Sequence, residues 1–357
     1  MPWPIATGTH TAGSSTPFRG ICNTSLMPRT SAMCYALTPP TNPDIAVANC
    51  MPRPVPDTIR SVYDVILFGF EADVLEIRLV ESFGLVTQTL LIESVYDHHG
   101  HRKPCVWKTI LRHDARFRKF TNVVSTCIRT LPKGVRVGAA PVDWQYEAWQ
   151  NQKANHFVGR RVPEDSIVVY GHADEIPSRA VWLKLATAPS LGPLPTNVAI
   201  TNLRGRFGYA HRSPFEAHGH PYTIGSPLVT RKPLFKADHP HGAYKNVWLV
   251  GGFHLTNYCY AGSRVLKEWT ATEARPDQMQ QNKPSCLSQV TGCRRSAIDA
   301  AHRVPVHLPL LLNCSLDRYP EWWHRDDARL KTPCAKNRPQ KRRVGGTQGR
   351  AHASTFS

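Results

Sequence analysis

The stretch Val168-Val169-Tyr170-Gly171-His172-Ala173-Asp174-Glu175-Ile176-Pro177-Ser178 decides the fold. Its apolar, β-branched first part continues the run from Ser166 and predicts a buried strand. The strand leads directly into His172, Asp174 and Glu175. Burying an unpaired carboxylate is unfavourable, so these side chains need a cation, hydrogen-bond donors or water. This order of residues is typical of the carboxyl edge of a parallel sheet, where ligands bind.

Strands and helices alternate on both sides of this stretch. Strands are predicted at 62–68, 86–92, 122–128, 166–170, 197–203 and within 247–258. Helices are predicted at 71–83, 143–158 with Asp143 as N-cap, and 177–186 with Pro177 in the first turn. The fold class is therefore α/β, with a single Rossmann-like, mainly parallel sheet, helices on both faces and long loops. The His-, Pro- and Gly-rich region between the last two strands is predicted to be loop or lid.

Composition divides the chain into three parts. Residues 1–57 are rich in Pro, Ser and Thr and are predicted to be disordered. Residues 58–325 form the predicted folded domain, in which 263–304 has no clear period and is interpreted as a divergent insert or loop. Residues 326–357 are predicted to be a basic, disordered tail.

The formal net charge of +18 is compatible with several kinds of anionic partner. No pattern of an RRM, KH or zinc-finger domain occurs, so no nucleic-acid partner is expected. No apolar run is long enough for a transmembrane helix, and no signal peptide is predicted. The ten cysteines show no C-x-x-C pair, which leaves both disulfides and free thiols open.

The acidic loop after the strand has two interpretations. Asp174 and its neighbours could face an open cleft and hold a divalent ion. Alternatively, Asp174 or Glu175 could cap the helix that follows Pro177. The local sequence does not decide between them.

Two further groups of polar residues are candidates for a binding site. Glu93 ends a buried strand and Lys103 follows it closely, which is compatible with a ligand site or with a structural salt bridge. Glu147, Gln150 and Asn151 share one face of a predicted helix, which could line a cleft or face solvent.

Histidines concentrate in the second half of the domain without the spacing of a catalytic zinc site. His254 follows Gly251, Gly252 and Phe253. The two glycines could let the backbone approach a ligand closely. The alternative is a bulged strand that carries a hydrogen-bonded histidine.

The chain resembles glycosyltransferase family 17, the family of β-1,4-mannosyl-glycoprotein 4-β-N-acetylglucosaminyltransferase. The resemblance extends over about residues 64–260 and again over 306–318. Its motifs are modest, and their number and order make the match specific. They are Asp64, Phe68, Glu71, Leu75-Glu76-Ile77-Arg78, Glu81, Ile92-Glu93-Ser94, Gly100, Lys103-Pro104, Glu147, Gln150-Asn151, Asp174-Glu175-Ile176-Pro177-Ser178, Gly252-Phe253-His254, Val306-His307-Leu308-Pro309 and Asp317-Arg318-Tyr319.

The resemblance implies a GT-A-like fold and an inverting transfer of N-acetylglucosamine from UDP-N-acetylglucosamine to a β-linked mannose of a protein N-glycan. It also implies a secretory compartment such as the Golgi. We expect His172 and Asp174 to hold a divalent metal, Mn²⁺ in the first place, against the donor diphosphate. The candidates for the general base are Glu175 and Glu216. Glu93, Lys103, Glu147, Gln150, Asn151 and His254 are expected to bind substrate.

The chain departs from the family pattern at the acidic loop. The family usually has Asp-x-Asp there, and His172 replaces the first aspartate. Histidine can ligate Mn²⁺ but adds no negative charge. A catalytically weak or inactive relative that binds nucleotide sugar or glycan is therefore the alternative. We expect Asp174→Ala to abolish transfer and leave the fold intact.

Overall fold

The computed structural model describes residues 20–22, 34–36, 51–52, 59–97, 102–131, 145–204, 209–210, 223–237, 247–256, 302–303 and 309–311. The predicted disordered segment 1–57, the predicted insert 263–304 and the basic tail 326–357 lie wholly or largely outside these residues. Glu216, the N-cap Asp143 and the histidines of the region 211–241 also lie outside them.

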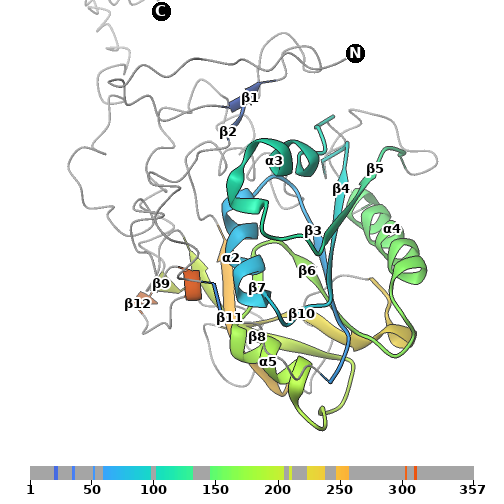
Figure 1. Cartoon of the computed structure of the whole chain (residues 1–357), viewed down its shortest axis with the longest axis vertical. Helices are drawn as coiled ribbons and strands as arrows, with labels where there is room; N and C mark the ends of the chain where they lie inside the picture. The colour runs from blue at the N-terminus through green and yellow to red at the C-terminus, as the bar shows by residue number, and fades with distance from the viewer. Residues whose placement is uncertain are drawn as a thin grey trace, which may run out of the picture.

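The centre of the fold is a mixed sheet of ten strands (Figure 1). Its main path runs in the order β12-β9-β8-β10-β6-β3-β4-β5, and β11 joins β8 and β7 beside it. A separate pair of strands, β1 (Gly20–Cys22) and β2 (Cys34–Ala36), is antiparallel. The strands of the large sheet are β3 (Val62–Leu67), β4 (Gln88–Ser94), β5 (Val123–Ile128), β6 (Ile167–His172), β7 (Glu175–Pro177), β8 (Thr196–Arg204), β9 (Tyr209–Ala210), β10 (Thr223–Arg231), β11 (Leu249–Thr256) and β12 (His302–Arg303).

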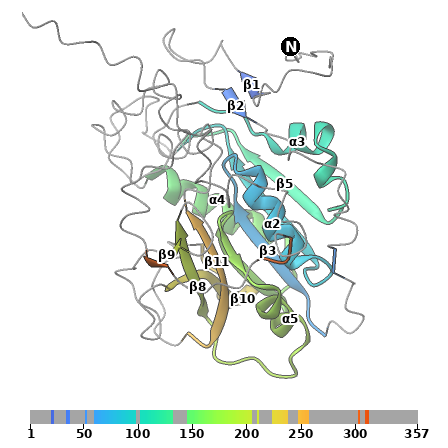
Figure 2. The same ribbon diagram turned by 90° about the vertical axis from the view of Figure 1, so that its left-hand side faces the viewer.

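Strands β6, β3, β4 and β5 are parallel, so their carboxyl ends lie at one edge. The other half is largely antiparallel, because β10 pairs antiparallel with both β6 and β8. Figure 2 shows β8, β10 and β11 side by side in that half. The predicted single α/β sheet is confirmed, and its parallel part is the half that carries the acidic loop.

Helices cover both faces of the sheet, as the sequence predicts (Figure 1). The helices are α2 (Ala72–Ser82), α3 (Trp107–His113), α4 (Gln145–Arg161) and α5 (Arg179–Thr187), with short 3-10 turns η1 (Ala115–Phe117) and η2 (Lys232–Leu234). The alternation of side chains along β3 explains the two layers. Tyr63, Val65 and Leu67 pack in the cluster that contains α4, whereas Ile66 packs with α2.

Several features of the chain differ from the prediction, among them helix α3, which lies where no helix was predicted. Pro177 does not open a helix; it ends β7, which pairs with β11, and α5 begins two residues later. The region predicted to be loop or lid contains β10, whose nine residues insert between β6 and β8. Pairing with two central strands stabilises β10, and the local sequence carries no strong strand period to reveal it.

Candidate functional site

The acidic loop lies at the carboxyl edge of the parallel strands. Leu67, the last residue of β3, is in register with His172, the last residue of β6. The amide of Ala173 donates to the Leu67 carbonyl (3.2 Å), which holds the start of the loop against the end of β3. The loop thus occupies the part of an α/β sheet where ligands bind.

A buried arginine fixes the shape of this loop. Arg78 of α2 donates from Nε and Nη2 to both carboxylate oxygens of Asp64 on β3, at 3.0 and 2.6 Å. Its Nη1 donates to the backbone carbonyls of His172 (2.5 Å) and Glu175 (2.8 Å), the residues on either side of Ala173-Asp174. Arg78 and Asp64 are both 0% exposed. The buried ion pair therefore holds the two ends of the acidic loop in place.

Sequence reasoning named Asp64 and Arg78 as family motifs and did not assign them a role. A signal was available, because Asp64 interrupts an apolar strand and Arg78 lies between two apolar helix residues. Charged side chains in such positions require a buried partner of opposite charge.

Glu175 takes part in the loop as a structural group. It is fully buried, and its Oε2 accepts a hydrogen bond from the amide of His172 (2.7 Å). Gly171 makes room for it, since a Cβ there would lie 2.5 Å from that same oxygen. A general base must reach the acceptor hydroxyl, and this placement favours a role in shaping the loop.

The start of α5 has another carboxylate partner. The amide of Arg179, the first residue of α5, donates to Oε2 of Glu81 on α2 (2.5 Å). Glu81 is buried, and burial raises the pKa of its carboxyl against the lowering effect of backbone amides and Arg179. This amide is one of those at the start of α5 that a helix-capping Asp174 or Glu175 could satisfy, so the contact speaks against the helix-cap interpretation of the acidic loop.

Strand β11 brings His254 to the acidic loop. Strand β11 pairs antiparallel with β7, with His254 in register with Glu175, and the amide of Leu255 donates to the Asp174 carbonyl (2.9 Å). Nε2 of His254 lies 3.4 Å from Oδ2 of Asp174. Two sequence motifs eighty residues apart in the chain thus meet at one point, about as far apart as two ligands of one ion.

The two glycines before His254 serve the packing of strands. Gly251 and Gly252 have positive φ, +128° and +140°, which glycine adopts at little cost. A Cβ on Gly252 would lie 2.3 Å from the carbonyl oxygen of Ile176 on β7. The register against β8 shifts between Val250 and Phe253. The bulged-strand interpretation is therefore confirmed, and the close neighbour of the glycines is β7.

The polar face of α4 points inward, toward the carboxyl ends of the strands. Glu147, Gln150 and Asn151 are all buried, so the interpretation as a solvent-facing helix surface is wrong. Oε1 of Glu147 lies 3.9 Å from Nε2 of His172, and Tyr170 on β6 donates from its hydroxyl to Asn151. Gln150 donates to the carbonyl of Tyr96 (3.5 Å). Glu147 and His172 thus extend the polar group at the acidic loop.

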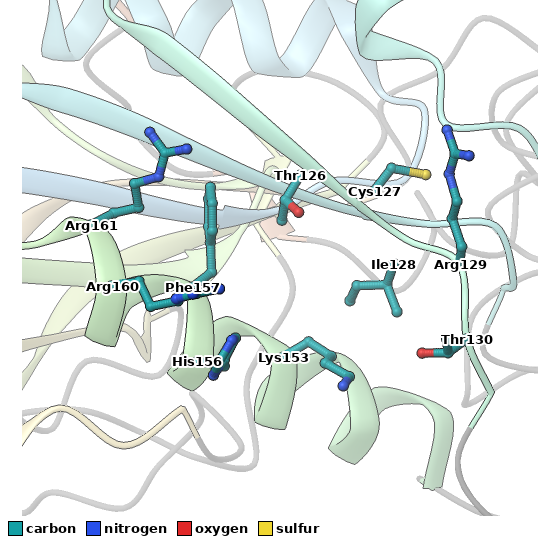
Figure 3. A pocket seen from close by; sticks show the side chains of 10 residues that line it. All are labelled: Thr126, Cys127, Ile128, Arg129, Thr130, Lys153, His156, Phe157, Arg160 and Arg161. Carbon is teal, nitrogen blue, oxygen red and sulfur yellow. The ribbon is translucent and has the colours of Figure 1, made fainter.

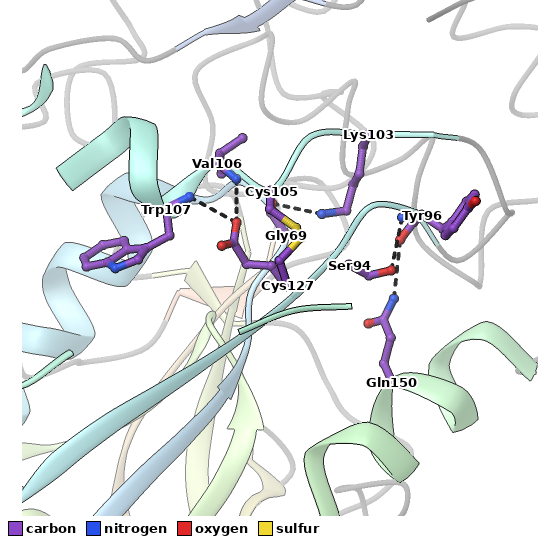
Figure 4. The surroundings of a disulfide bond; sticks show 10 residues. Gly69, Ser94, Tyr96, Lys103, Cys105, Val106, Trp107, Cys127 and Gln150 are labelled. Atoms are coloured by element: carbon purple, nitrogen blue, oxygen red, sulfur yellow. Dashed lines mark hydrogen bonds between the residues drawn. A yellow bond between two sulfur atoms is a disulfide. The ribbon is translucent and has the colours of Figure 1, made fainter. Parts of the chain in front are cut away.

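Glu93 has a different environment at the end of β4. Its Oε1 accepts from the amides of Val106 (2.5 Å) and Trp107 (3.1 Å), at the start of α3 (Figure 4). Burial raises the pKa of Glu93, and the charge of Lys103 and the two amides oppose that shift. The carboxylate therefore caps a helix, an arrangement that favours a structural role over the predicted role in substrate binding.

Lys103 and a disulfide belong to the same corner. Burial lowers the pKa of Lys103, opposed by Glu93 and other acids, and its Nζ donates to the Gly69 carbonyl (3.4 Å). Cys105, just before α3, is bonded to Cys127 on β5 (Figure 4). Cys127 is in register with Glu93, so the disulfide and the helix cap join the same strands and helix. Sequence reasoning left this pairing open.

The two predicted metal ligands, His172 and Asp174, lie near different side chains. Among the described residues, no group of three or more His, Cys, Asp or Glu side chains is arranged to hold a metal ion. The imidazole of His172 lies 3.9–4.0 Å from Glu147 and Glu175, whereas Asp174 lies near His254. One carboxylate and one imidazole suit Mn²⁺ chemically. Two such ligands fit an ion that is completed by water and a substrate diphosphate.

Comparison with known families agrees with this architecture. Residues 47–192 match the family model of Glycosyltransferase family 17. The matched segment spans the four parallel strands, the Asp64–Arg78 ion pair and the acidic loop, and it ends before β11. A search of the curated proteins found no match. Over residues 47–192, the chain is therefore similar to glycosyltransferase family 17.

Proposed function

We propose that this chain is a glycosyltransferase that transfers N-acetylglucosamine from UDP-N-acetylglucosamine to a β-linked mannose of a protein N-glycan, with inversion. The match of residues 47–192 to the family model supports the transferase class, and the resemblance of the motifs suggests the donor and acceptor. The observation that carries the proposal is the contact between Asp174 and His254 at the carboxyl edge of the sheet.

The reaction needs positive charge opposite the departing diphosphate. In a single displacement, the acceptor hydroxyl forms a bond to the anomeric carbon while the bond to the diphosphate oxygen breaks, and UDP leaves with that electron pair. A divalent ion, Mn²⁺ in this proposal, would supply the charge that stabilises the leaving group. Asp174 and His254 would hold it, which replaces His172 by His254 in the predicted pair.

The acceptor proton needs a base. Glu216 stays the predicted base and lies outside the described residues. Glu175 is less suited, because it is buried and bonded to its own loop. Arg78 is expected to act as a positioning residue, since it holds the two backbone carbonyls that flank Ala173-Asp174.

A donor screen with the purified full chain tests the proposal. We expect transfer from UDP-N-acetylglucosamine, and not from UDP-galactose, to a mannose-terminated N-glycan in the presence of Mn²⁺. Asp174→Asn should lower the rate by about 10²–10³-fold, the size of effect seen when a group that stabilises developing charge is removed. The matched control is Asp165→Asn, which alters an exposed carboxylate before β6 and should leave the rate unchanged.

Two results would count against the proposal. Equal rates in the two variants would remove Asp174 from the reaction. Binding of the donor by calorimetry without any turnover would support the alternative, a relative that binds nucleotide sugar and does not transfer it. The replacement of the first family aspartate by His172 is the feature that motivates this alternative.

We also propose that the domain works in a secretory compartment such as the Golgi. The Cys105–Cys127 disulfide supports this, because disulfides persist in oxidising compartments. In the part of the chain that the structure describes, no helix is both long and apolar enough to cross a bilayer. Mass spectrometry of the protein isolated from cells without reductant should find the Cys105–Cys127 cross-link; a fully reduced pair would contradict the proposal.

A further inference from the structure

A second site is suggested by a basic cavity between α4 and the edge strand β5 (Figure 3). The cavity has a volume of about 530 Å³, within the range of small-ligand sites. It shares no lining residue with the acidic loop. Its lining residues are Thr126, Cys127, Ile128, Arg129, Thr130, Lys153, His156, Phe157, Arg160 and Arg161.

The charge of the lining has one sign. Arg129 follows β5, and Lys153, Arg160 and Arg161 come from α4, whereas no Asp or Glu is among the lining residues. Four cations around one cavity repel one another and raise the local concentration of anions. Arg160 and Arg161 also lie in the last turn of α4, where positive charge is favourable for the helix. Helix stability does not account for Arg129 on the opposite wall.

The kind of anion follows from the other lining groups. Guanidinium groups bind oxyanions through paired hydrogen bonds, and the hydroxyls of Thr126 and Thr130 can bond to further polar groups. Sites for single-stranded nucleic acid use open aromatic rings on which bases stack. Phe157 lines the cavity, but the guanidinium of Arg161 lies over its ring at 5.7 Å, and Lys153 lies over Trp149 at 4.1 Å. The lining therefore favours a hydroxyl-rich ligand that carries acidic groups over a stack of bases.

We propose that this cavity binds an anionic oligosaccharide, one that carries sulfate or carboxylate groups. The choice of a glycan rests on the proposed function, while the binding itself requires no transfer. The cavity would hold a glycoprotein substrate through charged sugars other than the mannose that accepts the transferred sugar. The binding should weaken as salt rises, because the contacts are charged and partly exposed.

The test measures binding of the full chain to a heparin-derived hexasaccharide by calorimetry, at two salt concentrations and without nucleotide sugar. We compare Arg129→Gln/Arg160→Gln, which removes one cation from each wall, with Arg112→Gln/Arg118→Gln, which removes two exposed cations near α3. The expected result is an affinity at least about tenfold lower in the cavity variant and unchanged in the control variant. Uncharged chitohexaose should bind neither to the original chain nor to either double variant.

Three outcomes would overturn the inference. The first is the absence of hexasaccharide binding. The second is an equal loss in both double variants, which would show that the diffuse charge of the chain causes the binding. The third is tighter binding of a single-stranded oligonucleotide with the same sensitivity to Arg129 and Arg160, which would make the cavity a nucleic-acid site. Because no donor is present, a protein without transferase activity can still pass this test.

Discussion

Glu93 and Asp174 are both acidic residues at the carboxyl edge of the same sheet, and their surroundings differ. Glu93 ends β4, and its carboxylate accepts two backbone amides of α3. Asp174 follows β6, and its carboxylate lies beside the imidazole of His254, which β11 supplies from outside the matched family segment. The Glu93 carboxylate caps a helix. The Asp174 carboxylate lies beside an imidazole that could bind the same ligand.

The role of an acidic residue at the end of a strand thus depends on the element that lies next to its carboxylate. A helix start beside the strand turns the carboxylate into a cap. Where another group holds the backbone of the loop, the carboxylate is not needed as a helix cap. At Asp174 that other group is Arg78, which is paired with Asp64 and donates to the backbone carbonyls of His172 and Glu175.

The largest expected effect is on the support of the Asp174 loop. Arg78→Met leaves Asp64 buried without its counter-charge and should lower the free energy of unfolding by about 3–5 kcal/mol. Urea denaturation measures the change. The double variant Asp64→Asn/Arg78→Met should be less unstable than Arg78→Met, since it removes the orphaned charge. A double variant that is at least as unstable as Arg78→Met would show that the ion pair is not what holds this region.

The second largest effect is expected at the disulfide near Glu93. Replacing Cys105 and Cys127 by Ser removes a cross-link between residues 22 apart in sequence and should lower the free energy of unfolding by about 3 kcal/mol. Reductant should destabilise the original chain by a similar amount and leave the variant unchanged. A denaturation midpoint that does not move with the substitution or with reductant would contradict the disulfide.

The smallest effect concerns the strand that carries His254. Gly252→Ala forces a Cβ against the Ile176 carbonyl at a positive φ and should lower the free energy of unfolding by about 2 kcal/mol. Gly159→Ala is the matched control: it lies on α4 with open space around the new methyl group and should stabilise by about 0.5–1 kcal/mol. Effects of the same sign in both variants would contradict the close approach of β7 and β11.

Local patterns predicted much of the parallel half of the fold. The apolar runs predicted β3, β4, β5 and β6, and the helical period predicted α2 and α4 but not which way the polar face of α4 points. The antiparallel half was harder, since β10 is held by its pairing with β6 and β8. Pro177 was misassigned because proline suits both a first helical turn and the end of a short strand.

The residues of the site were predicted better than their partners. The sequence pointed to Asp174 and His254 separately, and the pairing of β7 with β11 brings them together. It could not show that Glu93 caps α3, because the helix starts fourteen residues later, after a segment without a strong sequence signature. The Arg78 contacts depend on backbone carbonyls, which have no residue-specific pattern in the sequence.

We infer that Asp174 takes part in sugar transfer, whereas Glu93 supports the structure. Both residues are changed to Ala, and each variant is measured twice, for sugar transfer with Mn²⁺ and for unfolding in urea. We expect Asp174→Ala to abolish transfer and to lower the free energy of unfolding less than Glu93→Ala does. Glu93→Ala should lose about 2 kcal/mol of stability and keep transfer in the fraction that is folded. The reverse pattern, with active Asp174→Ala and a stable but inactive Glu93→Ala, would contradict it.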